Sequence, residues 1–346
     1  MTIKYLDSKR MSGDTADIAA VSGGWKEIGR TTLGSAADTI TVSGLPDKRY
    51  YMIISSKLVS GNATHQFILN NDTGSNYAIR YSGDGGAEYA GVSLSNINFD
   101  PANATNSFHV GHIANLSSKE KIGIHHLVNQ NTAGAGTSTR RSEFVSKWAN
   151  TSSSMNRIDL KNTDSGNFDT GSEIVVLGWD DSDTHTSNFW EELASVNASG
   201  SSTNLSSGTI TAKKYLWIQC YSEGTGGDIL TTFNNDTGSN YTRRFSIDGG
   251  ADGTSVNETS IANMHNAGLG GDDAFSNWFI INNSANEKLV IGHSVQNGSA
   301  GAGTAPLRLE FVNKWANTSS QITEIDFDSQ SGNFGSDSII KVWGSN

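Results

Sequence analysis

The chain has 346 residues, a formal net charge of −11 and one cysteine, Cys220. A single cysteine excludes an intrachain disulfide, and the pattern around Cys220 is that of a strand with this residue in the core. Lys and Arg never occur in runs longer than two, which argues against non-specific nucleic-acid binding, because a phosphate backbone requires clustered positive charge. With 38 Gly, 3 Pro and only 17% charged residues, the surface is mostly hydroxyl and amide, which favours short strands over exposed helices.

The N-terminus predicts neither a secretory signal nor a membrane anchor. Residues 1–10 contain no apolar core segment, and a signal peptide requires one. No stretch approaches the roughly 20 apolar residues that a membrane-spanning helix needs. We therefore expect a protein that does not insert into a membrane.

An internal repeat organises the chain. Four segments recur in the same order, first at an offset of 164 residues (234 − 70), then twice at 167 (300 − 133) and last at 166 (331 − 165). They are 70–77 with 234–241, 133–137 with 300–304, 143–152 with 310–319, and 165–168 with 331–334. Four collinear matches do not arise by chance, so the sequence indicates a tandem duplication that differs only by loop insertions and deletions.

The repeat divides the chain into four parts. Copy one covers residues 25–180 and copy two covers residues 190–346. Between them, residues 181–189 are polar and partly acidic, as expected of a linker. Residues 1–24 have no counterpart in copy two, so we expect them to form a separate N-terminal arm that docks onto a neighbouring subunit.

Apolar residues alternate within each copy, as in strands with one buried face. The clearest cases are residues 158–160 and 173–179 in copy one, and 325–327 and 339–343 in copy two. Turns rich in Gly, Asn and Asp separate them, and residues 142–149 fit either a short helix or a strand. The sequence predicts an all-β fold of two tandem homologous β-sandwiches, jelly-roll-like in arrangement.

The repeated Asn-Asn-Asp-Thr-Gly-Ser-Asn-Tyr segment has two interpretations. Asp72 and Asp84, with their counterparts Asp236 and Asp248, offer the hard oxygen ligands that calcium prefers, although their spacing matches no EF-hand. In the alternative, the side chains cap their own backbone in a tight turn, and Gly74 supplies a positive φ. The turn is the favoured interpretation, and calcium is the one cofactor considered.

Trp148 and Trp315 stand at equivalent positions, each preceded by Lys and followed by Ala-Asn-Thr-Ser. An exposed Trp can stack on the apolar face of a sugar, which would make the pair a ligand-binding feature. In the favoured alternative, each ring closes one end of a sandwich core. Burial of the two rings discriminates between these interpretations.

The sequence contains no catalytic signature. His125 and His126 are adjacent, so in a strand they point to opposite faces and cannot readily share an ion. Nucleophile elbow, zinc-binding helix and phosphate loop are all absent. We therefore assign no catalytic residue and no confident metal ligand, and we expect a protein that is not an enzyme.

Three segments carry a resemblance to a known group of proteins. They are the start at 5–10, the block at 71–77, and a domain ending in which 165–168 leads to Leu177 and Gly178. Together they resemble structural proteins of tailed viruses, marine ones especially, whose β domains end in a Gly-Asn-Phe turn and an aromatic-Gly strand. Copy two keeps the aromatic as Trp343, whereas copy one has Leu177 there. The resemblance covers the arm and both copies, and it implies a component of the virion.

We therefore expect a virion structural protein that decorates the capsid or belongs to the tail or its fibres. Its expected partners are other capsid or tail subunits and further copies of itself, because duplicated sandwiches suit symmetric assembly. The alternative is a carbohydrate-binding module that recognises a glycan on the host surface.

Overall fold

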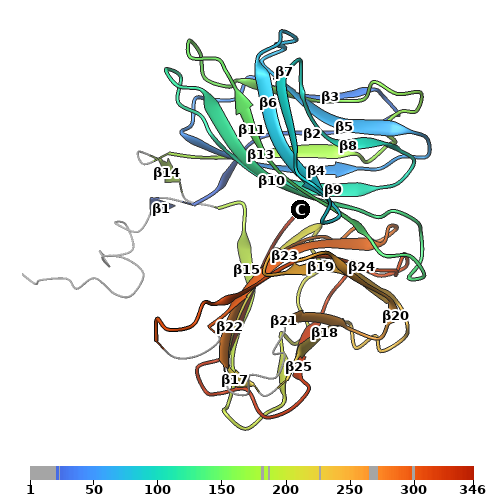
Figure 1. Cartoon of the computed structure of the whole chain (residues 1–346), viewed down its shortest axis with the longest axis vertical. Coiled ribbons are helices and arrows are strands. Elements are labelled where there is room, and N and C mark those ends of the chain that lie inside the picture. Colours follow the sequence, from blue (N-terminus) through green and yellow to red (C-terminus); the bar gives the residue numbers. More distant parts are fainter. Residues whose placement is uncertain are drawn as a thin grey trace, which may run out of the picture.

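A computed structural model describes residues 21–22, 24–180, 183–185, 188–225, 227–264, 272–297 and 301–346. All regular structure within these residues is β, and it forms two sandwiches, one for each copy of the repeat (Figure 1). The prediction of two tandem, jelly-roll-like β-sandwiches is confirmed. The described residues include no helix of the length and apolarity that crossing a membrane requires.

The first sandwich consists of an eight-stranded sheet over a four-stranded sheet, and every strand pair is antiparallel. The large sheet has the order β2-β13-β4-β9-β10-β11-β6-β7, and the small one β3-β12-β5-β8. The strands are β2 (Lys26–Thr32), β3 (Thr39–Ser43), β4 (Tyr50–Lys57), β5 (Ala63–Leu69), β6 (Tyr77–Gly83), β7 (Tyr89–Leu94), β8 (Ile97–Asn103), β9 (Ser107–Ala114), β10 (Lys121–Asn129), β11 (Arg140–Trp148), β12 (Arg157–Lys161) and β13 (Glu173–Trp179).

The second sandwich repeats this topology strand for strand. Its large sheet has the order β15-β26-β17-β22-β23-β24-β19-β20, and its small sheet β16-β25-β18-β21. The strands are β15 (Glu191–Asn197), β16 (Asn204–Ser206), β17 (Tyr215–Thr225), β18 (Ile229–Phe233), β19 (Tyr241–Ile247), β20 (Gly253–Glu258), β21 (Ile261–Met264), β22 (Asp272–Ile281), β23 (Lys288–Gln296), β24 (Leu307–Trp315), β25 (Ile325–Ser329) and β26 (Ile339–Ser345). Residues 142–149, which also fitted a helix, lie almost entirely in strand β11.

The predicted arm and linker meet in a short ribbon. Strand β1 (Val21–Ser22), at the end of the arm, pairs with β14 (Thr184–His185), inside the linker. Residues 1–20 of the predicted arm lie outside the described residues. The pairing joins the segment before the first sandwich to the segment that follows it.

Each sandwich has its own apolar core between its two sheets. The alternation that predicted the strands decides which side chains enter it, as in residues 121–125 of β10, where buried and exposed positions alternate. Cys220 is completely buried in the second core, as its strand context predicted. Burial raises the pKa of the Cys220 thiol to about 12, so it remains protonated.

A third apolar cluster joins the sandwiches through the outer faces of their large sheets. Figure 1 shows the two units one above the other, with β9 and β10 close to β23 and β24. The first sandwich contributes Met52, Ile54, Phe108, Val110, Val128, Val175 and Leu177, and the linker and second sandwich contribute Phe189, Tyr215, Ile281, Leu289, Ile291 and Val312. We call this contact the junction.

Buried polar contacts accompany the junction. Arg141 of the first sandwich bonds Asp252 and Glu310 of the second, with nitrogen–oxygen distances of 2.6 and 3.0 Å. The Tyr215 hydroxyl donates to Glu173 across the same contact, at 2.5 Å. Because buried charges are costly unless paired, these bonds select one relative placement of the two sandwiches.

Candidate functional site

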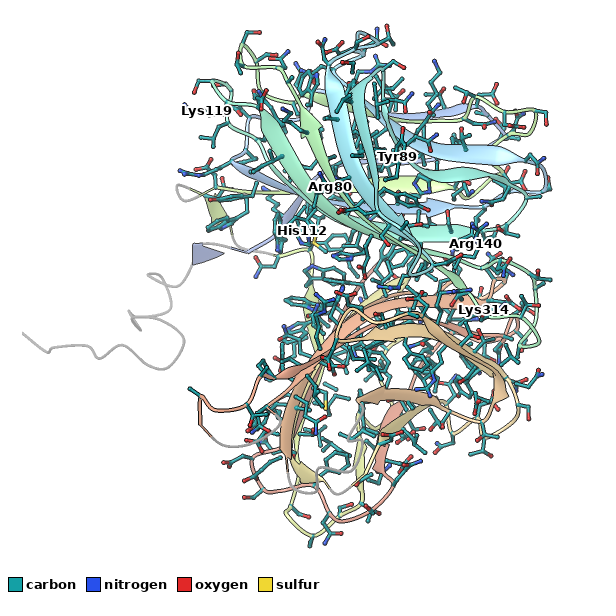
Figure 2. The ribbon with its side chains drawn as sticks, viewed as in Figure 1. Arg80, Tyr89, His112, Lys119, Arg140 and Lys314 are labelled. Carbon is teal, nitrogen blue, oxygen red and sulfur yellow. The ribbon has the colours of Figure 1, made fainter. Side chains whose placement is uncertain are left out.

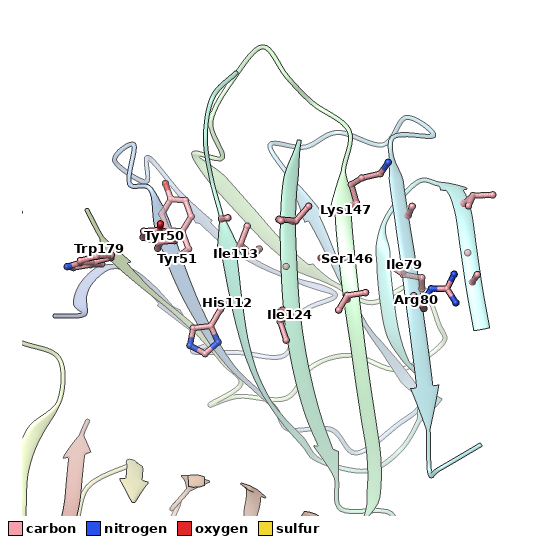
Figure 3. A pocket seen from close by; sticks show the side chains of 18 of the residues that line it. Tyr50, Tyr51, Ile79, Arg80, His112, Ile113, Ile124, Ser146, Lys147 and Trp179 are labelled. Atoms are coloured by element: carbon pink, nitrogen blue, oxygen red, sulfur yellow. The ribbon is translucent and has the colours of Figure 1, made fainter. Parts of the chain in front are cut away.

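The part of the first large sheet that the junction leaves uncovered is an open groove of about 870 Å³ (Figure 3). Its floor is the outward face of β4, β9, β10, β11, β6 and β7. Strand alternation places the groove residues there, because Ile122 and Ile124 point outward while His125, the residue after Ile124, points into the core.

Aromatic side chains form one end of the groove. The rings of Tyr50 and Trp179 are stacked with centroids 5.2 Å apart, and Trp25 lies 5.8 Å from the imidazole of His112. Figure 3 shows Tyr50 and Trp179 beside each other, with His112 on the neighbouring strand. This end presents flat apolar surfaces whose polar atoms are few.

Aliphatic side chains form the middle of the groove. Ile122, Ile124 and Val145 are exposed neighbours on β10 and β11. The cationic side chains of Arg80 and Lys147 stand at the opposite edge, and the described residues that line the groove include no Asp or Glu. A contiguous exposed apolar surface with a polar rim is typical of a site that binds another molecule.

The predicted tryptophans lie in the cores and not in the groove. Trp148 and Trp315 are each 1% exposed, so neither offers a ring face to a sugar. Each indole N–H donates to the carboxylate of the repeated turn, Trp148 to Asp72 and Trp315 to Asp236, both at 2.7 Å. The ligand-stacking hypothesis is wrong for these two rings, because each ring packs inside the end of its sandwich core, where burying a large aromatic side chain is favourable.

The carboxylate of the repeated turn accepts hydrogen bonds from the backbone and side chains of the same turn. Asp72 accepts a bond from the Gly74 N–H and another from Asn76, both at 2.9 Å, and Asp236 has the same pattern in the second copy. Burial alone would raise the pKa of Asp72, but these bonds and the one from Trp148 lower it. The geometry is that of the turn interpretation. The expectation that Gly74 supplies the positive φ is wrong, because Asn70 and Asn71 have it, at 50° and 56°.

Asp84 and Asp248 do not join these turns. Asp84 follows β6, whereas Asp72 precedes it, and a strand of seven residues separates them by about 20 Å. Asp84 bonds the backbone N–H of Arg141, and Asp248 that of Arg308, both at 2.8 Å. The structure therefore does not bring the four predicted calcium ligands together in pairs.

The first core contains a buried chain of hydrogen-bonded histidines. His109 lies 3.1 Å from His125, which reaches Ser146 at 2.8 Å, and Ser55 lies between His65 and His109. Burial lowers the pKa of His125 to about 3 and holds the pKa of His65 and His109 well below the usual value. The three rings are therefore neutral structural groups at neutral pH.

His126, Glu143 and His293 form a second group, at the junction. Their donor atoms lie within 4.8 Å of one another, and two His with a carboxylate are a set that zinc accepts. Arg141 donates to Glu143 at 2.6 Å and already neutralises that carboxylate. The group is better described as part of the polar seam between the sandwiches.

Sequence reasoning missed the groove, although a signal for it exists. The segment 121–129 places apolar residues on both faces of one strand, with Ile122 and Ile124 on one and Leu127 on the other. Such a pattern predicts a strand covered on both sides. Which part of the outer face is covered depends on the junction, and no sequence pattern displays the junction.

No family model matches the chain, and no curated protein matches it. Among solved structures, domains LG4–5 of the mouse laminin alpha1 chain cover 93% of this chain and 90% of their own, with 10% identity and a TM-score of 0.20. Neisserial surface protein A covers 81% of this chain and 96% of its own, with 6% identity and a TM-score of 0.11. Likenesses at such TM-scores carry no argument about this chain.

Proposed function

We propose that this chain is a non-enzymatic structural protein of a virion, and that the groove of its first sandwich docks another protein chain of the particle. The supporting observation is the exposed aliphatic row of Ile122, Ile124 and Val145 across two adjacent strands. Removing aliphatic surface from water lowers the free energy and requires no directional contacts, which suits protein docking. The virion as the setting rests on the resemblance of the sequence.

The composition of the groove also argues for docking over catalysis. Hydrolytic sites need convergent acids, bases or nucleophiles. The titratable groups that line the groove are Tyr50, Tyr51, Arg80, His112 and Lys147, on strands β4, β6, β9 and β11. No carboxylate accompanies them among the described lining residues, so the usual acid–base pair of a glycosidase is missing there.

Carbohydrate binding is the second candidate, and the aromatic end of the groove favours it. Tyr50 and Trp179 are stacked and line the groove with Trp25, and partly exposed rings of this kind suit the apolar face of a sugar. A glycan array with the purified chain tests this directly. We expect no binding; binding that disappears in Trp179→Ala would replace the docking proposal with a glycan site.

Quantitative mass spectrometry of gradient-purified particles tests the structural role. We expect the chain at a copy number comparable to that of other structural subunits. The variant Ile124→Asp, which places a charge in the groove, should be lost from the particles. The charge-matched control Ser199→Asp, in an exposed loop of the second sandwich, should be retained. Absence of the wild-type chain from particles, or retention of Ile124→Asp, overturns the proposal.

A further inference from the structure

Equivalent residues of the two sandwiches differ in burial: residues that are exposed in one sandwich are covered in the other. Strands β9–β11 correspond to β22–β24 at a constant offset of 167 residues (289 − 122). In the first sandwich the aliphatic row is open to solvent, and in the second the same row is covered. The exposed fractions are 59% for Ile122 against 2% for Leu289, 57% for Ile124 against 3% for Ile291, and 47% for Val145 against 2% for Val312.

The opposite half of the same sheet face shows the reverse. Phe108 and Val128 of the first sandwich are 1% and 0% exposed, whereas their counterparts Phe275 and Val295 are 41% and 42% exposed. The junction therefore covers different halves of the two outer faces. A contact between unlike surfaces is heterologous. In each sandwich, the half of the outer face that stays exposed is equivalent to the half that the other sandwich buries in the junction.

The loop between β10 and β11 shows how the junction closes. Gln130 donates to Glu287 at 2.6 Å, and the Gly134 N–H donates to the same carboxylate. Lys314 donates to the carbonyl of Thr132 and lies at the junction in Figure 2. Both Glu287 and Lys314 are buried by this loop. The first sandwich thus supplies a loop, and the second supplies a socket of Glu and Lys.

The loop and the socket each have a counterpart in the other sandwich that does not take part in the junction. The Ala-Gly-Ala-Gly-Thr sequence of the loop returns at 300–304, and its described residues 301–304 are exposed. The socket returns as Glu120 and Lys147, which are exposed and lie 3.4 Å apart. The duplication has preserved a loop on the second sandwich and a socket on the first.

The residues of one buried ion pair of the junction also have exposed counterparts. Arg141 and Asp252 form a buried bridge across the junction at 2.6 Å. Their counterparts are Arg308 on the second sandwich and Glu88 on the first, whose side chains are 58% and 54% exposed. A cation and an anion therefore accompany the two unused surfaces, with the sign that a repeat of the junction requires.

We propose that copies of this chain associate head to tail, with the second sandwich of one copy seated in the groove of the first sandwich of the next. The contact repeats the junction between molecules. The inference deepens the proposed function by naming the docked partner as a second copy of the chain. Because a heterologous contact leaves one surface open at each end, the copies either close into a ring or continue as a filament.

The junction specifies the contacts. Phe108 stacks on Tyr215 within the chain, with centroids 6.4 Å apart, so Phe275 of one copy should stack on Tyr50 of the next. The intermolecular surface is more polar than the junction, since Gln219 stands at the position equivalent to Ile54 of the first sandwich. We therefore expect the association to be weaker than the junction and to depend on protein concentration.

A complementation experiment tests head-to-tail association. Light scattering over a concentration series should show a mass rising above the 36.8 kDa of one chain. Ile124→Asp blocks only the groove, and Phe275→Asp blocks only the opposite surface. Each alone should remain at one chain mass, because an unpaired charge in a dry contact weakens association by about 100-fold or more. An equal mixture keeps one intact pair of surfaces and should stop at twice the chain mass.

The mixture separates the proposal from its rivals. A symmetric groove-to-groove dimer would leave Phe275→Asp alone still associated, which overturns the head-to-tail arrangement. A wild-type chain that stays at one chain mass also overturns it, even when the chain is abundant in particles, and then the structural role survives without self-association. The charge-matched Ser199→Asp should associate like the wild type, and its failure to do so would show that charge alone, rather than its position, prevents association.

Discussion

Acid should destabilise the first sandwich before the second, because only the first contains the buried histidine chain. The counterparts of His65, His109 and His125 in the second sandwich are Ile229, Ser276 and Gly292. Burial lowers the pKa of all three histidines in the fold, whereas an unfolded histidine titrates near 6.5. The unfolded chain therefore takes up more protons, so stability is complete above about pH 6.5 and is lost progressively as the pH falls towards the folded pKa.

The magnitude follows from linkage. Each histidine that stays neutral in the fold costs about 1.4 kcal/mol per pH unit below 6.5. At about pH 5 this amounts to about 2 kcal/mol for each ring and about 6 kcal/mol for the three, a large part of the stability of an ordinary domain. Asp72 also has a shifted pKa, but a lowered carboxylate pKa matters only below about pH 4. Burial also lowers the pKa of His112 and His126 in the first sandwich and of His293 in the second, so the acid effect is larger in the first sandwich.

Hydrogen exchange resolved by segment measures this effect within the intact chain. Strand β5, which contains His65, should lose protection between pH 7 and 5, after correction for intrinsic exchange. Its counterpart β18 should lose much less, and both strands lie in small sheets away from the junction. His125→Asn should reduce the pH slope at β5, whatever it does to stability at pH 7. Parallel loss in β5 and β18, or an unchanged slope in the variant, would refute the linkage argument.

Three further substitutions and one chelator experiment have defined outcomes. Asp72→Ala leaves the Trp148 indole N–H without its acceptor, so urea denaturation should show a loss of about 2 kcal/mol; a chelator should leave the melting temperature of the wild type unchanged. Glu173→Gln removes the anion bonded by Tyr215 at the junction. It should lower the free energy of unfolding by about 3 kcal/mol, which a reduced melting temperature would show. Arg141→Met should cost a similar amount in chemical denaturation, because it strands the buried carboxylates of its bridges.

Much of the fold was accessible from the sequence because its signals are local. The repeat is a matter of identity between segments, and strands such as 173–179 follow from alternation and turn residues. The repeated turn was also readable, since Asp72 and Gly74 are close in sequence and their bond is short-range. The helix-or-strand ambiguity at 142–149 was resolved by pairing with β10 and β6, which are long-range partners.

The candidate site was not accessible in this way. Ile124 and Ile291 are the same residue type at equivalent positions of equivalent strands, yet one is exposed and the other is buried. For Trp148 a ligand contact stayed open beside the favoured core position, because a sequence does not show whether a ring closes a core. The sequence by itself determined two copies of one all-β domain, since duplication and alternation are carried by neighbouring residues. Only the tertiary structure decided which half of each sheet stays open, because the junction is formed by residues far apart in the chain.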